Sequence, residues 1–229
     1  LAIFLFHGVV DHSEYEVRNY NRKHISRQYF IEVLSDLKDK GTAISIEDAV
    51  ELMLHKEAFP KRSFAVTFDD GFYNNYQVAA PILRNLNIPA AFYITTDFID
   101  NNRMSWIDRI EYCCETVRRG TVVLPWEKKS FTLDSREEKI TFLEYLRRHV
   151  KRNASIDTER LVTDVFEQCD LKEVLESDDP IDLKMSWNDI KELQGEPLFT
   201  IGGHTHNHAN LGFLNKNDLA GNDAARHVF

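Results

Sequence analysis

Apolar and polar residues alternate along the chain with two periods, one typical of buried strands and one typical of amphipathic helices. Short apolar runs predict strands at residues 1–6, 42–44, 64–68, 90–94 and 199–203. Between these runs, apolar residues spaced three and four apart predict helices. Strands that alternate with helices indicate an α/β fold with a parallel sheet, in which functional residues lie at the carboxyl ends of the strands.

Helix signals are clearest in the first part of the chain. A helix is predicted at residues 26–40, because Ser26 is a favourable N-cap residue and the apolar residues lie on one face. A second helix follows Ser45, which begins a capping signal. Residues 74–86 predict a third helix with an irregularity at Pro81, because proline removes a backbone donor.

The stretch at about residues 98–185 has a different character. It is rich in charged residues and mostly helical by pattern, with two apolar stripes at helical spacing. One stripe contains Ile140, Leu143 and Leu146, and the other contains Leu161, Val162, Val165, Phe166 and Cys169. We interpret this stretch as a helical insertion whose stripes pack into a core.

Composition narrows the class of protein. The chain has 229 residues, of which 43% are hydrophobic, enough for one domain over residues 1–229. A net charge of −9 without a basic block argues against nucleic acid as a partner. No apolar run approaches the roughly 18 residues that a membrane span needs.

Cysteine usage and the start of the chain bear on the compartment. The three cysteines do not form a disulfide framework, which favours a reducing, cytoplasmic compartment. The chain begins at Leu1, not Met, and no signal peptide is visible. A missing N-terminal segment would leave a cell-envelope or secreted location open.

Two adjacent carboxylates follow the strand predicted at residues 64–68. Asp69 and Asp70 belong to the sequence T-F-D-D-G, and Gly71 lets the backbone turn sharply after them. An isolated D-D-G is usually only a turn, because Asp and Gly both favour turns. At the end of a buried strand, the pair also lies where parallel α/β folds place functional groups.

Three histidines follow the last predicted strand, in the sequence H-T-H-N-H. His204 and His208 are four residues apart, so we expect both imidazoles on one side of a helical turn, with His206 pointing away. A surface loop that happens to be rich in histidine is the alternative. One carboxylate and two imidazoles form a ligand set used by catalytic Zn²⁺ and by non-haem iron, and the other carboxylate can then act as a base.

Together the two motifs resemble those of the polysaccharide deacetylases, the NodB-homology or carbohydrate esterase 4 family. That family has T-F-D-D-G as its first motif and H-[S/T]-x-x-H as its second, and the chain matches every specified position. The resemblance extends over roughly residues 1–98 and 186–214. It implies a distorted (β/α) barrel of the NodB type that is interrupted by the helical insertion.

The resemblance also implies roles for the motif residues. Asp70, His204 and His208 would hold a divalent metal ion, Zn²⁺ in the first place, and Asp69 would be the general base. The family's later motifs, an Arg and a Tyr on one strand and a late catalytic His, are not identifiable, and the surroundings of His227 match poorly. We therefore expect the barrel to be incomplete in its C-terminal part, because the strands counted here are too few to close it.

His7 is the candidate for the catalytic acid. It ends the first strand in residues 6–9, F-H-G-V, which resemble the Tyr-His-x-Val segment of the poly-N-acetylglucosamine deacetylases, where an N-terminal His is the acid. Adjacent strand ends of a barrel surround one pocket, so His7 could reach the metal site. A His that merely closes a strand end is the alternative.

These residues predict a metal-dependent deacetylase that hydrolyses N-acetyl groups on an amino-sugar polysaccharide or glycoconjugate. Trp106 and Trp187 flank the insertion and either line a sugar cleft or pack in a core, and we favour packing. Two other functions stay open: a deformylase or O-deacetylase of a lipid- or nucleotide-linked sugar, and a degenerate carbohydrate-binding module that retains the metal. Asp69 favours an enzyme, because a mere binding site does not need it.

Overall fold

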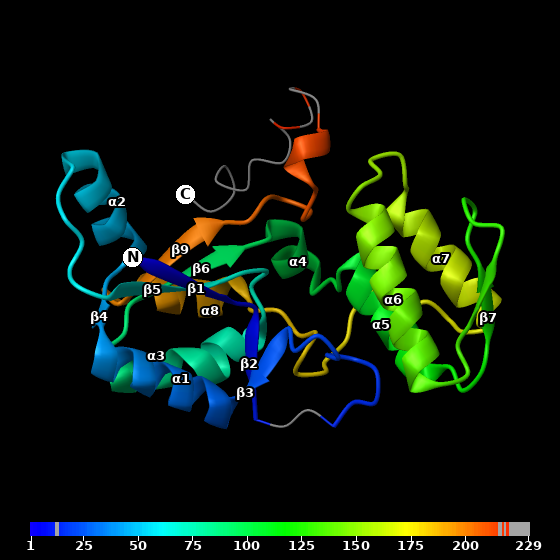
Figure 1. The fold of residues 1–229 in the computed structure, drawn as a ribbon, viewed down its shortest axis with the longest axis horizontal. Coiled ribbons are helices and arrows are strands. Elements are labelled where there is room, and N and C mark those ends of the chain that lie inside the picture. The colour runs from blue at the N-terminus through cyan, green and yellow to red at the C-terminus, as the bar shows by residue number, and fades with distance from the viewer. Residues whose placement is uncertain (12–13, 215–216, 218, 220–229) are drawn as a thin grey trace.

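The computed structural model describes residues 1–11, 14–214, 217 and 219 and has two parts that lie next to each other (Figure 1). One part is a parallel sheet with helices, and the other is a group of helices from the middle of the chain. His227, considered above as a late histidine, lies outside the described residues. Within those residues, no helix is both long and apolar enough to cross a membrane.

The main sheet contains five parallel strands at the positions that the apolar runs predict. Its path runs in the order β1-β5-β6-β9, and β4 also pairs with β5. The strands are β1 (Ala2–Phe6), β4 (Thr42–Ala43), β5 (Ser63–Phe68), β6 (Ala90–Ile94) and β9 (Phe199–Gly203). The register sets Phe6, Phe68 and Phe92 side by side, so β1, β5 and β6 bring their carboxyl ends to one edge.

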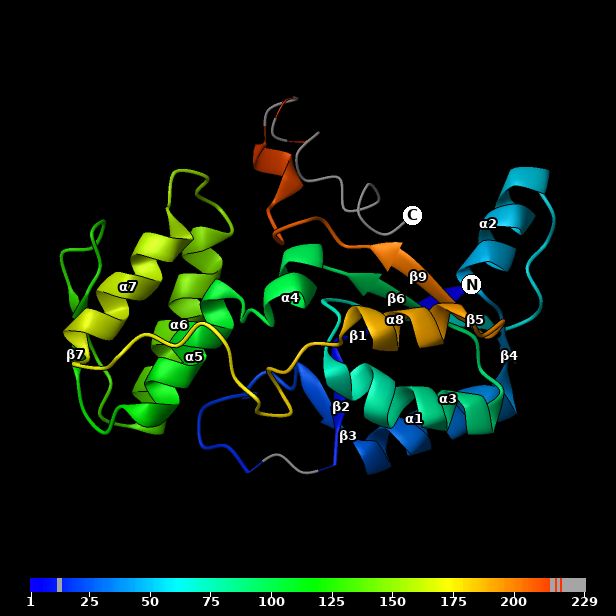
Figure 2. The same cartoon turned by 180° about the vertical axis from the view of Figure 1, so that it is seen from behind.

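Helices cover one face of this sheet (Figure 2). They are α1 (Arg27–Lys40), α3 (Ala80–Leu86) and α8 (Trp187–Gln194). Their apolar faces meet the strands in a core that includes Phe30, Leu34, Leu83, Ile190 and Leu193. The irregularity predicted at Pro81 is confirmed, because a π-helical turn (Asn75–Ala79) precedes α3 and the proline lies in the first turn of α3.

The remaining elements of this part are short. They are β2 (Gly8–Val10), β3 (His24–Ser26), α2 (Ile46–His55), α4 (Thr96–Asn101) and a 3₁₀ turn (Leu211–Phe213). β2 and β3 pair in parallel as a separate two-stranded sheet, which the sequence did not predict. The capping signal at Ser45 is confirmed, since its side chain accepts from Asp48 N and the Asp48 side chain accepts from Ser45 N.

The sheet is open over the described residues. Leu1, Ile3 and Leu5 alternate along β1, and each is about half exposed (46%, 57% and 54%), so this part of the sheet has no second layer over it. A closed barrel buries its inward-facing side chains and needs more strands than the five seen here. The predicted barrel is therefore not seen in the described residues, and it stays a prediction.

Residues between α4 and α8 form the group of helices on the other side of the molecule (Figure 1). Its larger elements are α5 (Trp106–Thr116), α6 (Arg136–Val150) and α7 (Thr158–Gln168), and a hairpin of β7 (Thr121–Val123) and β8 (Ser130–Thr132) packs beside them. Both predicted apolar stripes lie in a second core here. The three cysteines belong to this core and are free, and the compartment stays a prediction.

Candidate metal and catalytic site

A cleft of about 1770 Å³ runs between the carboxyl ends of the strands and the helical insertion. The strand side contributes all five predicted site residues, His7, Asp69, Asp70, His204 and His208. The insertion side contributes Trp106, Arg147, Lys151, Asn153 and Glu159, among others. The structure thus brings together residues that are nearly 200 positions apart in the sequence, at one edge of the sheet.

The two carboxylates lie in a tight turn after β5. The Asp69 N–H donates to the Phe6 carbonyl at 3.1 Å and so extends the pairing of β1 with β5 by one residue. Asp70 and Gly71 then adopt left-handed backbone angles, with φ of +73° and +80°. Asp tolerates this region better than most residues do. Glycine suits this left-handed conformation, and a side chain at position 71 would also have to displace Ile99 Cδ1, which would lie 2.8 Å from its Cβ.

The histidines lie in a loop, and the prediction of a helical turn at residues 204–208 is wrong. Thr205 and His208 have left-handed backbone angles, with φ of +66° and +58°, which a right-handed helix does not contain. The loop is fixed from outside, because the N–H groups of Thr96 and Asp97 at the start of α4 donate to the carbonyls of Thr205 and His206. The two imidazoles converge through this loop conformation and not through helical spacing.

Asp70, His204 and His208 form a three-residue group whose ligand atoms all lie within 4.8 Å of one another. Asp70 Oδ1 is 3.4 Å from His208 Nε2 and 3.8 Å from His204 Nε2. This oxygen is buried and has no hydrogen-bond partner among the described residues. Tetrahedral ligands about 2.0–2.1 Å from zinc lie about 3.3 Å apart. An orphaned carboxylate oxygen facing two imidazole nitrogens therefore fits a divalent metal ion.

His206 lies outside this group, as expected. Its Nδ1 is 2.8 Å from Thr96 Oγ1, so its ring is turned towards α4.

The protonation states at the site suit metal binding. Burial would raise the pKa of Asp70, but the charges of Lys23, His208 and His7 outweigh this effect and lower it to about 2. Burial lowers the pKa of His208 below its usual 6.5, against the opposing charge of Asp70. An ionised carboxylate and a neutral imidazole are the forms that coordinate metals.

Asp69 lies next to the group without belonging to it. Its Oδ2 is 3.9 Å from His204 Nε2. Burial raises the pKa of Asp69 above its usual 3.8, although the charge of His204 opposes this. A carboxylate with a raised pKa, on the wall of the cleft and beside the metal ligands, has the properties of a general base.

His7 occupies the bend between β1 and β2 and lines the same cleft. Close packing fixes the backbone after it, because a side chain at Gly8 would lie 2.1 Å from the Nδ1 of buried His24. Burial lowers the pKa of His7 below 6.5, and the charge of Asp70 opposes this effect. His7 is therefore placed to exchange a proton with a group bound in the cleft.

The two tryptophans have different surroundings. Trp106 lines the cleft and also packs against the core of the insertion. Trp187 packs against the core of the sheet and donates from Nε1 to Asp100 Oδ1 at 2.7 Å. The favoured packing role is thus seen for both rings, and Trp106 is in addition available to a ligand.

Sequence reasoning missed two charged residues at the site. Lys23 Nζ lies 3.4 Å from Asp70 Oδ2 and 3.1 Å from Asp108 Oδ2. Lys23 precedes β3 in a polar stretch, and Asp108 lies in the first turn of α5. Neither belongs to a motif, so no signal in the sequence marks them.

Comparison with known proteins identifies the family of the chain. The family described as "Polysaccharide deacetylase" matches residues 56–224, which is more than half of the chain. No curated protein matches the chain.

Two solved structures share the fold. A de-N-acetylase from Aggregatibacter actinomycetemcomitans has 18% sequence identity and a TM-score of 0.51, over 93% of this chain and 59% of that one. A polysaccharide deacetylase from Bacillus cereus has 15% identity and a TM-score of 0.50, over 95% of this chain and 42% of that one. The chain thus spans about half the length of these structures.

Proposed function

Because the chain belongs to the polysaccharide deacetylase family, we propose that it is a metal-dependent enzyme that removes N-acetyl groups from an amino-sugar polysaccharide or glycoconjugate. The observation that carries this proposal is the buried Asp70 Oδ1, which accepts no hydrogen bond from the described residues and faces the Nε2 atoms of His204 and His208. Residues 1–229 would form one catalytic domain of the distorted-barrel type, with a helical insertion at about residues 98–185.

Each residue of the site has a distinct task in this proposal. A divalent ion held by Asp70, His204 and His208, Zn²⁺ in the first place, would supply Lewis-acid chemistry, which polarises an acetyl carbonyl and makes a water more acidic. Asp69 would accept the proton of the attacking water. His7 would donate a proton to the amine nitrogen as the carbon–nitrogen bond breaks, because an amine is a poor leaving group without that proton.

The size of the cleft supports an extended substrate. Pockets for a single small molecule usually measure about 300–1,000 Å³, whereas this cleft measures about 1770 Å³ and reaches from Asp70 to Lys151 and Asn153 of the insertion. Trp106 on its wall offers an apolar ring to a sugar face. A polymer of amino sugars would occupy more of this space than a single sugar would.

Two other functions remain candidates. The same residues could hydrolyse a formyl or O-acetyl group of a lipid- or nucleotide-linked sugar. A degenerate carbohydrate-binding module would retain the metal but would have no use for Asp69, whose buried carboxylate lies directly beside the metal ligands. Asp69 therefore favours catalysis over binding.

The test is acetate release from chitin oligomers and from poly-β-1,6-N-acetylglucosamine, with the zinc-loaded chain and with Asp69→Asn as its matched variant. We expect acetate from at least one substrate with the natural chain, and a loss of release with the variant. Binding of either sugar without any release would support the module. Release only from formylated or O-acetylated sugars would replace the N-acetyl specificity.

A further inference from the structure

The two oxygens of the Asp70 carboxylate face different groups. Oδ1 faces the imidazoles of His204 and His208, and Oδ2 faces the ammonium of Lys23 at 3.4 Å. A carboxylate that is held through one oxygen presents the other in a fixed direction. Partners of this kind, which contact a metal ligand and not the metal, orient the ligand and tune the affinity of the site.

Lys23 is itself held from the insertion. Its ammonium donates to both oxygens of Asp108, at 3.2 and 3.1 Å. It also lies 4.6 Å from the centre of the Phe72 ring. The Lys23 side chain is only 14% exposed, so water competes little for these contacts. Asp108 belongs to α5 and its N–H donates to Ser105 Oγ, the N-cap of that helix.

Helix α5 also fixes the backbone that leads to Lys23. The Glu115 carboxylate accepts the N–H groups of residues 16, 17 and 18, and the Glu111 carboxylate accepts that of Asn19. The Asn19 side chain in turn exchanges two hydrogen bonds with the backbone of His24, both at 2.8 Å. Lys23 thus lies inside a short loop whose two ends, Asn19 and His24, are hydrogen-bonded to each other. Asn19 also attaches this loop to α5.

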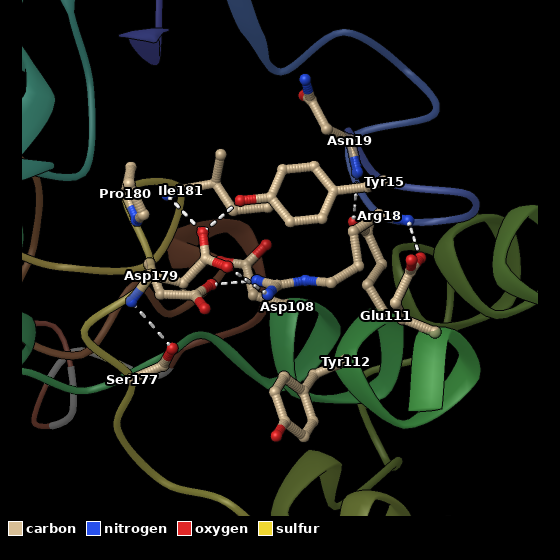
Figure 3. A network of polar contacts seen from close by, with 12 residues as sticks. Tyr15, Arg18, Asn19, Asp108, Glu111, Tyr112, Ser177, Asp179, Pro180 and Ile181 are labelled. Carbon is tan, nitrogen blue, oxygen red and sulfur yellow. Dashed lines mark hydrogen bonds and ion pairs between the residues drawn. The ribbon is translucent and has the colours of Figure 1, made fainter. Parts of the chain in front are cut away.

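The neighbouring contacts strengthen this attachment. Arg18 pairs with Asp179 and Asp182, and its guanidinium stacks near the rings of Tyr15 and Tyr112. Figure 3 shows Tyr15, Asp179 and Tyr112 around Arg18, with Asp108, Glu111 and Tyr112 contributed by the same helix, α5. The segment that leads to Lys23 is therefore attached to α5 by several contacts.

We propose that Lys23, fixed by Asp108, is a positioning residue that holds the Asp70 carboxylate in its metal-binding orientation and thereby couples the helical insertion to the metal site. This inference rests on the metal site of the proposed function. It gives the insertion a second role, in addition to forming a wall of the cleft.

The charges of the three side chains explain why Asp108 is needed for Lys23 to position Asp70. Asp70 and Asp108 are both buried, and Lys23 lies between them as their shared counter-ion. Its positive charge helps to lower the pKa of both carboxyls, against the effect of burial. Without Asp108, the ammonium keeps its attraction to Asp70 but loses the contacts that fix its position. Without Lys23, the two buried carboxylates lose the cation that lies between them.

The test measures zinc affinity of the full chain by competition with a chromophoric chelator, together with thermal unfolding of each variant. Lys23→Met should bind zinc about 10–100-fold more weakly, as is typical when such a partner is removed. Asp108→Asn, which keeps its size, should lose affinity by a smaller factor. The double variant should be no weaker than Lys23→Met alone, because Asp108 acts through Lys23.

Lys139→Met is the matched control. Lys139 is a buried lysine of α6 in the insertion. Its ammonium donates to the Val117 carbonyl at 2.6 Å, within the same part of the molecule. This variant should unfold at a lower temperature but bind zinc like the natural chain.

Several results would overturn the proposal. These are unchanged zinc affinity in Lys23→Met, an additive loss in the double variant, or an equal loss in Lys139→Met. If Lys23→Met does not fold, Asp108→Asn decides, and unchanged zinc affinity there rejects the coupling. If the natural chain itself binds no zinc, the metal site of the proposed function fails first, which is a distinguishable outcome.

Discussion

The sheet and the helical insertion are built around separate apolar cores, but only the sheet carries the candidate site. The core of the sheet is rich in aromatic rings: Phe6, Phe30 and Phe68 are in mutual contact, and Phe92 stacks on Phe68. The core of the insertion is mostly aliphatic and includes the three cysteines. Within the described residues, the one group suited to a metal belongs to the sheet. The site thus depends on the carboxyl ends of parallel strands and on the loops that follow them. The two strands of the insertion, β7 and β8, are antiparallel.

The boundary between the two parts differs from both cores. Buried charged residues gather there, among them Arg18, Asp108, Asp182 and Lys184, and the Lys23 side chain is only 14% exposed. Burial lowers the pKa of Lys184 to about 8, against the charge of Asp108. Buried charges are costly unless they are paired. Their concentration at this boundary indicates that it has a function beyond packing, and the predictions below separate the contributions of the two parts.

The largest effect should follow from removing a metal ligand of the sheet. Asp70→Ala and His208→Ala each leave two of three ligands, so we expect elemental analysis to find no stoichiometric zinc and assays to find no deacetylation. His149→Ala is the control from the insertion, where the ring of His149 stacks on Trp126. That variant should keep its zinc. Undiminished metal in both site variants would reject the ligand assignment.

A smaller effect, on turnover alone, should follow from Asp69→Asn. The amide cannot accept a proton from water, so turnover should fall by about 10²–10⁴-fold, the usual contribution of a general base. Zinc content should not change, because Asp69 is not in the ligand group. Asp164→Asn on α7, where Asp164 forms an ion pair with Arg160 of the same helix, is the control and should be fully active. Normal turnover in Asp69→Asn would exclude Asp69 as the base.

His7→Ala should lose amide hydrolysis by about 10²-fold, at the lower end of the range for acid–base catalysis. It should lose less on an activated ester, whose leaving group needs little protonation. An acid must be protonated to act, so kcat/KM of the natural chain should fall as pH rises through the pKa of His7. Burial places this pKa below 6.5, although Asp70 opposes the shift. The His7→Ala variant should lack this descending limb.

Two results would contradict this role of His7. An equal loss on both substrates would indicate that the residue positions the substrate, and no loss on either would return it to a structural role. At lower pH, activity should decline as Asp69 becomes protonated, since burial raises its pKa above 3.8.

The sequence predicted the strands of the main sheet and the two apolar cores well, because both depend on local periodicity. The five site residues that it named line one cleft, because their motifs follow strands whose carboxyl ends share one edge, and their roles stay predictions. The sequence failed for the conformation of the histidine loop, which depends on hydrogen bonds from α4. It missed Lys23 and Asp108 altogether, because a buried ion pair between distant segments leaves no periodic pattern.

The smallest expected effects concern the helix caps, which both parts contain. Ser45 and Ser135 each form a capping box, at the start of α2 beside the sheet and of α6 in the insertion. Replacing either serine by alanine should lower the free energy of unfolding by about 1 kcal/mol, because one backbone donor loses its partner. Each serine makes its capping hydrogen bonds within the start of its own helix, away from Lys23 and Asp108. Zinc affinity should therefore match that of the natural chain in both variants. Thermal unfolding and chelator competition measure the two quantities separately. A loss of zinc affinity in Ser135→Ala, but not in Ser45→Ala, would show that the metal site responds to the stability of the whole insertion and not only to the contact between Lys23 and Asp108.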